Sequence, residues 1–394
     1  MEPILRFKAD DGSDFSDWEK MTLGDVCVFV RNGYAYSSDG SRNHRYKLTR
    51  IESISGGVIN DEKLGSSDEI DPRYRLVDGD ILFSNINSLP YLGNVARYTN
   101  DLGEIYHGMN LLCIRPRANE INSIFLFELL GTSRIRRYEI THAKAAVNQC
   151  SLPSSDVKAM SLYCPSLPEQ RKIADLLSAV DDVITTQEAE VAAWEKRKKG
   201  VMQKLFSQEV RFKADDGSDF PDWEEKTLGD ICVYERQRSE GANFVGTENM
   251  LKDFGGVTFD NSNADGSGTL YHPGDTLMSN IRPYLKKAWL ADRKGTCSTD
   301  VLVFHPTSVE PGYLYWLIAS DAFVRYVMSA AKGSKMPRGD KKHIMEMPLL
   351  LPNKDEQRKI DDCLSSLNDV IIKAKNELAK WQELKKGLLQ QMFV

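Results

Sequence analysis

The sequence predicts an α+β protein made of two similar α+β modules, each followed by one long helix, with the two helices paired as an antiparallel coiled coil. Three observations lead to this prediction. Short segments recur in the same order along the 394 residues, two 38-residue stretches contain no proline, and the apolar residues of those stretches follow a seven-residue repeat. The result is a pseudo-two-fold internal repeat. We divide the chain into a first module at 1–165, a first long helix at 166–207, a second module at 208–352 and a second long helix at 353–394.

The internal repeat begins near the N-terminus. The segment RFKADDGSDFSDWE at 6–19 recurs as RFKADDGSDFPDWE at 211–224, with one difference in fourteen positions. Further along, VDGDILFSNI at 77–86 matches HPGDTLMSNI at 272–281, and the offset falls from 205 to 195. The sequences between the shared segments differ. A shared scaffold with different loops indicates two related binding modules with different targets; neutral drift of surface loops after duplication is the alternative.

Each module shows the same succession of predicted elements. A turn followed by a buried strand is predicted at 79–84 and 274–279, because Gly-Asp precedes a run of apolar residues. A further strand with alternating apolar residues then precedes an amphipathic helix at 123–140 and at 312–328. We expect a curved, mostly antiparallel sheet in each module.

The long helices follow Pro168 and Pro352, because proline cannot continue a helix and biases the residue before it toward an extended conformation. Their apolar residues are spaced alternately by four and three, which is typical of a coiled coil. A lysine interrupts both patterns at the same place, at Lys198 and Lys385, which indicates that the helices pack against each other. Two ordinary amphipathic helices in separate domains are the alternative. Because the second module starts where the first helix ends, paired helices must run antiparallel, with one module at each end.

No catalytic constellation is visible in the sequence. It contains no GxxxxGK[ST], HExxH or GxSxG motif, which mark nucleotide-binding loops, zinc proteases and serine hydrolases. The seven cysteines are scattered and the six histidines dispersed, so we expect no metal site and free thiols in a reducing cytoplasm. No apolar run approaches the ~18 residues of a membrane span. The net charge of −6 is mild evidence against a protein that carries a whole nucleic-acid interface alone.

Candidate binding residues gather in loops that follow the matching strands, at 84–94 and 279–287, and in the basic stretches at 41–50 and 332–342. These loops combine asparagine, tyrosine and basic residues, which can reach adenine, guanine and phosphate. A third basic run, at 134–137, is predicted to be a solvated helix face. The candidate DNA-binding residues are Arg42, Asn43, Arg45, Lys47, Asn85, Asn87, Tyr91, Lys144, Gln149, Asn280, Arg282, Tyr284, Lys286, Lys332, Lys335 and Arg338.

The order of elements resembles the specificity subunit of type I restriction-modification systems. The resemblance rests on the W…LGD openings at 18–25 and 223–230, on the GDIL strand, and on the PxLPEQxKI-type entries to the long helices at 165–173 and 355–360. It covers essentially the whole chain. It implies two target recognition domains, at 1–165 and 208–352, each reading one half of an asymmetric bipartite site on double-stranded DNA. It also implies that the helices act as a ruler.

The same resemblance implies partners. Two methyltransferase (modification) subunits would dock on the helices and supply S-adenosylmethionine for adenine N6 methylation. A restriction subunit would add translocation and cleavage with ATP and Mg²⁺, so this chain would be a non-catalytic subunit of a prokaryotic, cytoplasmic host-defence complex. One departure concerns a Gly-Ser-x-Gln-like turn of the family, which 333–336 fits only in part and 145–149 less well.

Partner contacts are expected on the outer faces of the long helices. A coiled-coil scaffold that presents two divergent modules to protein ligands is the alternative function. The candidate partner-binding residues are Glu169, Arg171, Lys172, Lys196, Arg197, Glu356, Arg358 and Lys359.

Overall fold

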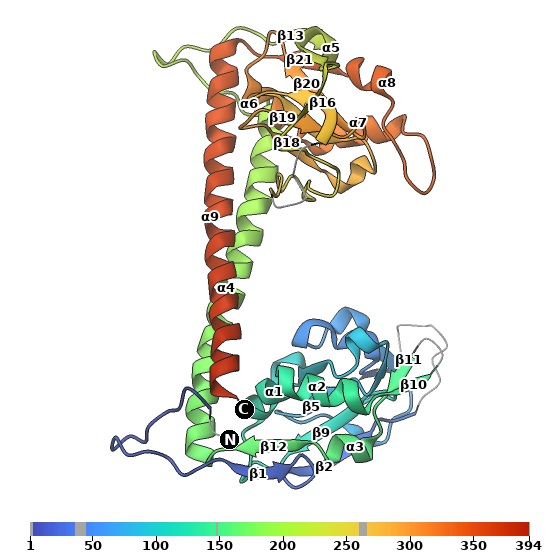
Figure 1. Cartoon of the computed structure of the whole chain (residues 1–394), viewed down its shortest axis with the longest axis vertical. Helices are drawn as coiled ribbons and strands as arrows, with labels where there is room; N and C mark the ends of the chain where they lie inside the picture. Colours follow the sequence, from blue (N-terminus) through green and yellow to red (C-terminus); the bar gives the residue numbers. More distant parts are fainter. Residues whose placement is uncertain (1–2, 36–44, 147–148, 260–265, 394) are drawn as a thin grey trace. The chain divides into compact units, whose positions relative to one another are not determined.

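The computed structural model describes residues 3–35, 45–146, 149–259 and 266–393 (Figure 1). The chain divides into two compact units, Met1–Glu188 with Asn376–Val394 and Ala189–Lys375. Each unit contains one module together with part of each long helix. The four segments predicted from the sequence, by contrast, treat the helices as separate from the modules.

The core of the first unit is a four-stranded antiparallel sheet with both faces buried. Its strands, in sheet order, are β2 Cys27–Asn32, β9 Leu112–Pro116, β5 Ile81–Phe83 and β7 Val95–Arg97. Because successive side chains of a strand point to opposite faces, Phe83 packs with Phe125 of helix α1 (Ser123–Leu130), while Leu82 packs on the other side with Leu76. The buried strand predicted after Gly79 is confirmed.

Smaller elements surround this sheet. A two-stranded sheet is formed by β1 Glu19–Thr22 and β12 Ser161–Cys164. One three-stranded sheet contains β4 Gly65–Ser67, β3 Tyr46–Leu48 and β8 Ile105–Tyr106, and a second contains β10 Lys144–Ala146, β11 Gln149–Ser151 and β6 Ile86–Asn87. The remaining helices are α2 Ser133–His142 and α3 Ser154–Lys158, with 3-10 turns at Ile51–Ser53, Ser55–Gly57, Asp61–Lys63, Pro72–Tyr74, Leu89–Tyr91 and Asn100–Leu102.

The second unit repeats the central sheet. Its strands, in sheet order, are β14 Cys232–Tyr234, β20 Val301–Pro306, β17 Thr276–Ser279 and β18 Ala288–Leu290. One further sheet contains β15 Arg238–Gly241, β16 Gly266–Tyr271 and β19 Gly295–Cys297, and another pairs β13 Glu224–Thr227 with β21 Pro348–Leu351. The helices are α5 Leu228–Ile231, α6 Pro311–Ile318, α7 Asp321–Ser329 and α8 Lys341–Met345, and η8 Pro283–Leu285 is a 3-10 turn.

The internal repeat is confirmed by this shared strand order and by repeated side-chain contacts. Arg6 pairs with buried Glu169 at 2.7 Å in the first unit, and Arg211 pairs with buried Glu356 at 2.7 Å in the second. The near-identical segments that carry these arginines therefore fold in the same way in both units.

The predicted single helices at 123–140 and 312–328 are wrong in one respect, because each is two helices. A break separates α1 from α2 at Gly131 and Thr132, and another separates α6 from α7 at Ala319 and Ser320. The hydroxyl of Ser320 accepts a hydrogen bond from the Phe323 amide at 3.1 Å and so caps the start of α7. Thr132 caps α2 in the same manner.

The long helices are α4 Leu167–Phe206 and α9 Lys354–Met392. In the first unit Asp181 of α4 contacts Lys385 of α9, and Glu188 contacts Gln382. Residue numbers thus rise along one helix as they fall along the other, which confirms antiparallel pairing there.

The second unit shows the same direction of pairing, since Glu195 contacts Lys375 and Lys198 contacts Asn368. None of the predicted seam residues of either helix is exposed, which confirms the seven-residue pattern. No helix among the described residues has the length and hydrophobicity that a membrane span requires.

Candidate nucleic-acid interface

In the first unit, three separate parts of the sequence meet in one small sheet beside the central one. β6 follows β5 directly and pairs with β11, so that Asn87 lies opposite Cys150. β11 in turn pairs with β10, which places Gln149 opposite Ala146 and Ser151 opposite Lys144. The predicted residues Asn87, Lys144 and Gln149 are therefore brought onto one surface element.

The second unit has the same arrangement in a more basic form. Ile281, just after β17, forms an isolated antiparallel bridge with Arg338, and Arg338 forms another with Lys332. The Arg282 amide donates a hydrogen bond to the Pro337 carbonyl at 2.8 Å. The loop at 279–287 and the basic hairpin at 332–338 are thus neighbours, as the equivalent segments are in the first unit.

Each loop also presents an exposed tyrosine on a short 3-10 turn. The sequence Pro-Tyr-Leu occurs at 90–92 and at 283–285, and the exposed fractions of Tyr91 and Tyr284 are 58% and 48%. A solvated phenol ring next to polar strand ends can stack on a base or donate a hydrogen bond to a phosphate.

Two predicted base contacts are wrong. Asn85 and Asn280 are only 6% and 8% exposed, because each continues a strand whose two faces are both buried. The Asn85 side-chain amide donates to the Leu152 carbonyl at 3.3 Å, and the Asn280 backbone amide donates to the Asp300 carbonyl at 2.7 Å. The Asn85 side chain thus helps to hold its loop in place, and neither asparagine side chain is exposed for a base contact.

Several predicted cations have acidic partners. Lys286 pairs with Asp321, Lys332 with Asp340 and Arg338 with Asp300, at 2.7, 2.8 and 2.9 Å. The Lys332 ammonium, hydrogen-bonded to Asp340, is the largest cause that holds the pKa of Asp340 at about 2, with amides of the following helix adding to it. Lys335 is exposed at the tip of the hairpin.

The basic stretch at 41–50 is described only in part. Arg42 and Asn43 lie outside the described residues. Arg45 is exposed and lies over the Tyr46 ring at 5.1 Å, and Lys47 pairs with Asp61 at 2.7 Å. Of these two cations, Arg45 therefore lies against an aromatic ring and Lys47 has an acidic partner.

The basic run at 134–137 is the predicted solvated face only in part, since Arg137 is exposed but Arg134 and Arg136 are half-buried. Arg134 lies over the Tyr163 ring at 4.3 Å. Arg136 donates hydrogen bonds to the carbonyls of Leu89 and Leu92, which flank the exposed Tyr91. Sequence reasoning missed this residue because its acceptors are backbone atoms more than forty positions away.

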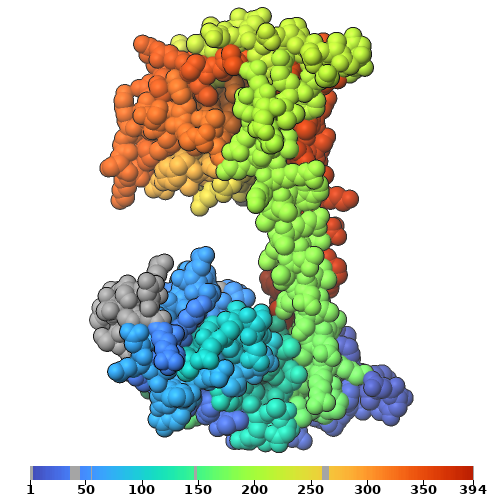
Figure 2. All heavy atoms as spheres, turned by 180° about the vertical axis from the view of Figure 1, so that it is seen from behind, coloured from blue at the N-terminus to red at the C-terminus, as the bar shows by residue number. Residues whose placement is uncertain are grey.

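The predicted partner-binding residues fall into three groups: exposed residues, lysines paired with an aspartate, and buried glutamates. Figure 2 shows α4, in green, exposed on one face, and Arg171, Lys196, Arg197 and Arg358 are exposed on the long helices. Lys172 and Lys359 contact Asp10 and Asp215 at 2.6 Å each.

The placement of Glu169 and Glu356 on an outer face is wrong. Both carboxylates are fully buried, each paired with the arginine of its own unit, and Glu356 also accepts a hydrogen bond from the Trp223 indole at 2.9 Å. They fasten the N-terminal segment of each module to its helix and cannot contact a partner.

The chain has two equivalent modules on antiparallel helices, and each module has an exposed tyrosine turn beside a strand pair. This arrangement defines a two-module nucleic-acid specificity protein. The comparisons with known proteins agree with this class. The chain belongs to the family described as the Type I restriction modification DNA specificity domain, which matches residues 15–193 and again 221–381. The family domain is therefore present twice.

Known relatives and structures carry the same description. The chain is 38% identical over 231 residues to the putative type I restriction enzyme MjaX specificity subunit of Methanocaldococcus jannaschii, a match that spans 56% of this chain and about half (54%) of that relative. It is 20% identical to the MjaVIII specificity subunit of the same organism, over 96% of this chain and 92% of the relative.

The fold likewise matches the crystal structure of a type I restriction-modification S subunit from M. genitalium. The TM-score is 0.62 at 16% identity, and the match covers 100% of this chain and 99% of that one. A chain from a structural study of complex assembly and conformational transition of the type I R-M system has a TM-score of 0.55 at 19% identity, over 96% of this chain and 97% of that one. At these identities the likeness concerns the fold alone.

Proposed function

We propose that this chain is the DNA-specificity subunit of a type I restriction-modification complex and that each module reads one half of an asymmetric bipartite DNA target. The observation that carries the proposal is the repeated pairing of a post-strand loop with a second segment, at 86–87 with 150–151 and at 281 with 338. The equivalent positions hold different side chains, such as Gln149 in one module and Met336 in the other. Different side chains on one scaffold favour two different half-sites.

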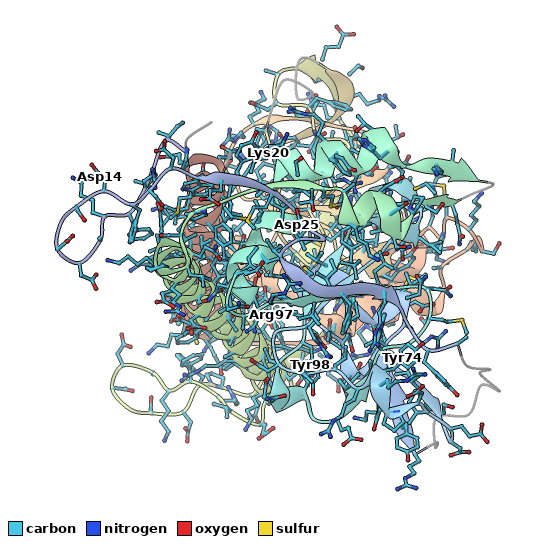
Figure 3. All side chains as sticks on the ribbon, turned by 90° about the horizontal axis from the view of Figure 1, so that it is seen from below. Asp14, Lys20, Asp25, Tyr74, Arg97 and Tyr98 are labelled. Carbon is cyan, nitrogen blue, oxygen red and sulfur yellow. The ribbon has the colours of Figure 1, made fainter. Side chains whose placement is uncertain are left out.

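Docking of two identical modification subunits is supported by a surface that the two units share. The segments 6–19 and 211–224 differ at one position, although much of each is exposed; Asp14 and Asp219 are more than four-fifths exposed. Figure 3 shows the hairpin that carries Asp14 projecting from its unit. Packing does not require identical exposed residues, so a common partner for both hairpins and for Arg171 and Arg358 explains them.

On this proposal the chain itself is not catalytic. S-adenosylmethionine belongs to the modification subunits that methylate adenine, and ATP and Mg²⁺ to a restriction subunit. The complex would act in the cytoplasm of a prokaryote, where the DNA is.

The test is to express the chain with its modification partner and to locate methylated adenines in the host DNA by single-molecule sequencing. We expect one bipartite motif, with two different half-sites and a fixed non-specific spacer. Methylation without sequence preference, or a complex with no preference for any duplex, would contradict the proposal and favour a scaffold for protein ligands.

A further inference from the structure

The turn after β17 in the second unit is held in a strained conformation. Arg282 and Lys286 flank the 3-10 turn η8 and both have left-handed backbones, with φ of 50° and 54°. Residues other than glycine rarely adopt this conformation, because the Cβ atom crowds the backbone. Such strain persists only where the surroundings hold it, so these residues need a compensating contact.

The first unit shows how the turn is built without that strain. When the Pro-Tyr-Leu sequences are aligned, Lys286 corresponds to Gly93, which also has a positive φ, of 80°. Glycine adopts this conformation at no steric cost. A lysine in its place is therefore unfavourable unless its side chain contributes something in return.

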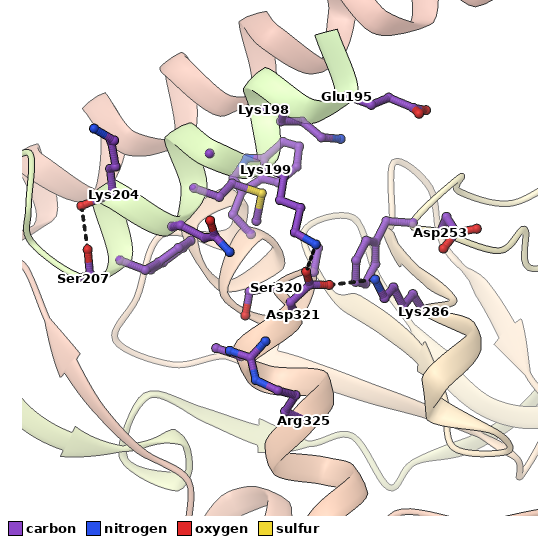
Figure 4. Close-up of a pocket in the computed structure, with 18 of the residues that line it drawn as sticks. Glu195, Lys198, Lys199, Lys204, Ser207, Asp253, Lys286, Ser320, Asp321 and Arg325 are labelled. Atoms are coloured by element: carbon purple, nitrogen blue, oxygen red, sulfur yellow. Dashed lines mark hydrogen bonds and ion pairs between the residues drawn. The ribbon is translucent and has the colours of Figure 1, made fainter. Parts of the chain in front are cut away.

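The Lys286 side chain makes one clear contact, an ion pair with Asp321 at the start of α7. The distances from Asp321 are 2.7 Å to Lys286 and 2.7 Å to Lys199 of α4, one for each carboxylate oxygen (Figure 4). All three side chains are within the second unit, and Asp321 is 22% exposed. A single carboxylate thus joins the turn, the helix beside it and the long helix.

The first unit fastens the equivalent turn to the equivalent helix with different groups. Arg136 of α2 donates to the carbonyls of Leu89 and Leu92 and pairs with Glu139 at 3.0 Å. A Cβ atom on Gly93 would lie 2.1 Å from the Glu139 carboxylate, so the turn and the carboxylate are packed together.

The residues that fasten the turn differ between the two units. In α7 the positions of Arg136 and Glu139 are occupied by Val324 and Val327, which are buried. The position of Asp321 is occupied in α2 by Ser133. Two unrelated sets of charged residues hold the same turn against the same helix, which argues that the fastening itself is required.

We propose that Asp321 and Arg136 are positioning residues for DNA recognition, each of which fastens the tyrosine turn of its own unit so that it meets DNA in a fixed conformation. This rests on the proposed function above. A turn fixed before binding loses less conformational entropy when it binds, and so discriminates better between targets. Lys286 is then part of the fastening and not a phosphate contact.

The test uses the complex of the full chain with its modification subunits and three duplexes: the target, and the target altered in either half-site. Asp321→Asn should reduce discrimination at one half-site by roughly tenfold, and Arg136→Gln should do so at the other, about the effect of one mismatched base pair. Adding Lys286→Gly to Asp321→Asn should not restore discrimination, because glycine relieves the strain but leaves the turn unfastened, as Gly93 would be without Arg136. A role of Asp321 confined to offsetting the strain at Lys286 predicts full rescue instead.

Glu346→Gln is a matched control, since this carboxylate is in the same unit, is 59% exposed and pairs only at 3.6 Å with Lys342. It should leave both half-sites unchanged. Equal losses at both half-sites from either variant, or full rescue by Lys286→Gly, would overturn the proposal.

Hydrogen exchange in the full chain without DNA gives a second readout. The amides of Leu285 and Lys286 are hydrogen-bonded within the turn and should exchange faster in Asp321→Asn. Unchanged exchange would overturn the fastening. If the wild-type complex does not distinguish the three duplexes, the proposed function fails, and exchange alone still decides whether Asp321 holds the turn.

Discussion

At the scale of single residues, Glu139 is a buried carboxyl group whose pKa is raised beside the tyrosine turn of the first unit. Its side chain is buried, with 2% exposed, and one carboxylate oxygen pairs with Arg136. Burial raises the pKa of Glu139 to about 7, although Arg136 acts in the opposite direction. The carboxyl group therefore binds a proton more tightly in the folded chain than in the unfolded chain, where the pKa is near 4.5.

The sign of the resulting pH dependence follows from this difference. The stabilising contribution of the protonated carboxyl is fully present below pH 4.5 and is lost as the pH rises to about 7. Glu139→Gln stays neutral at every pH, so between pH 5 and 8 its stability should rise relative to wild type, by on the order of 2 kcal/mol. Urea unfolding of the full chain at several pH values measures this. A difference between the two proteins that does not change with pH would contradict it.

Residue-level prediction from sequence succeeded where exposure follows from a turn and failed where it depends on tertiary burial. The Pro-Tyr-Leu turns expose Tyr91 and Tyr284, as expected of polar loops after a strand. Asn85 and Asn280 look equally polar in the sequence, but the chain stays buried for two residues after β5 and for one residue after β17. Nothing in a local pattern reveals where that burial ends.

At the scale of the helices, the lysines that interrupt the seam have different surroundings in the two units. Lys385 contacts Glu128 at 3.0 Å and Asp181 at 2.8 Å, whereas Lys198 contacts the Asn368 amide oxygen at 2.9 Å and lies over the Trp316 ring at 5.4 Å. Burial lowers the pKa of Lys198. Burial acts on Lys385 too, but its carboxylate partners outweigh it and raise the pKa of Lys385.

Replacing each lysine by methionine should therefore have unequal effects. Lys385→Met leaves Glu128, which is almost fully buried, without its cation, and should destabilise the first unit by about 2–4 kcal/mol. Lys198→Met removes a desolvated ammonium that has no carboxylate partner in the seam, and should be neutral or slightly stabilising. Urea unfolding of the two full-length variants provides the comparison. Equal destabilisation would show that the partners do not matter.

The helices also show what a sequence pattern predicts well and what it does not. A long seven-residue pattern predicted the buried seam because each apolar residue adds to the same signal. The breaks at Gly131 and Ser320 were missed because the apolar pattern continues across them, and only the caps Thr132 and Ser320 mark the new helices. A serine or threonine inside an apolar segment is a weak signal on its own.

At the scale of the whole chain, the two units share a scaffold but differ in the loops that are proposed to read DNA. The ion pairs of Arg6 and Arg211 with the long helices are repeated at the same distance, while the loops at 84–94 and 279–287 differ in length and charge. On the proposed function, segments that bind a common partner should stay alike, and segments that read different DNA sequences should differ. The length of the helices would then set the spacer between the two half-sites of the target.

Lengthening the helices tests this last point. One heptad inserted after Glu188 in α4 and another after Lys375 in α9 keeps the antiparallel seam in phase and adds about 10 Å to each helix. Since base pairs are about 3.4 Å apart, the spacer between the half-sites should lengthen by about three base pairs, while both half-site sequences stay the same. Sequencing of methylated adenines in a host that carries the variant complex measures the spacer and both half-site sequences at once. A heptad in only one helix should instead disrupt the pairing and abolish methylation, and an unchanged spacer with both insertions would show that the helices do not set the distance.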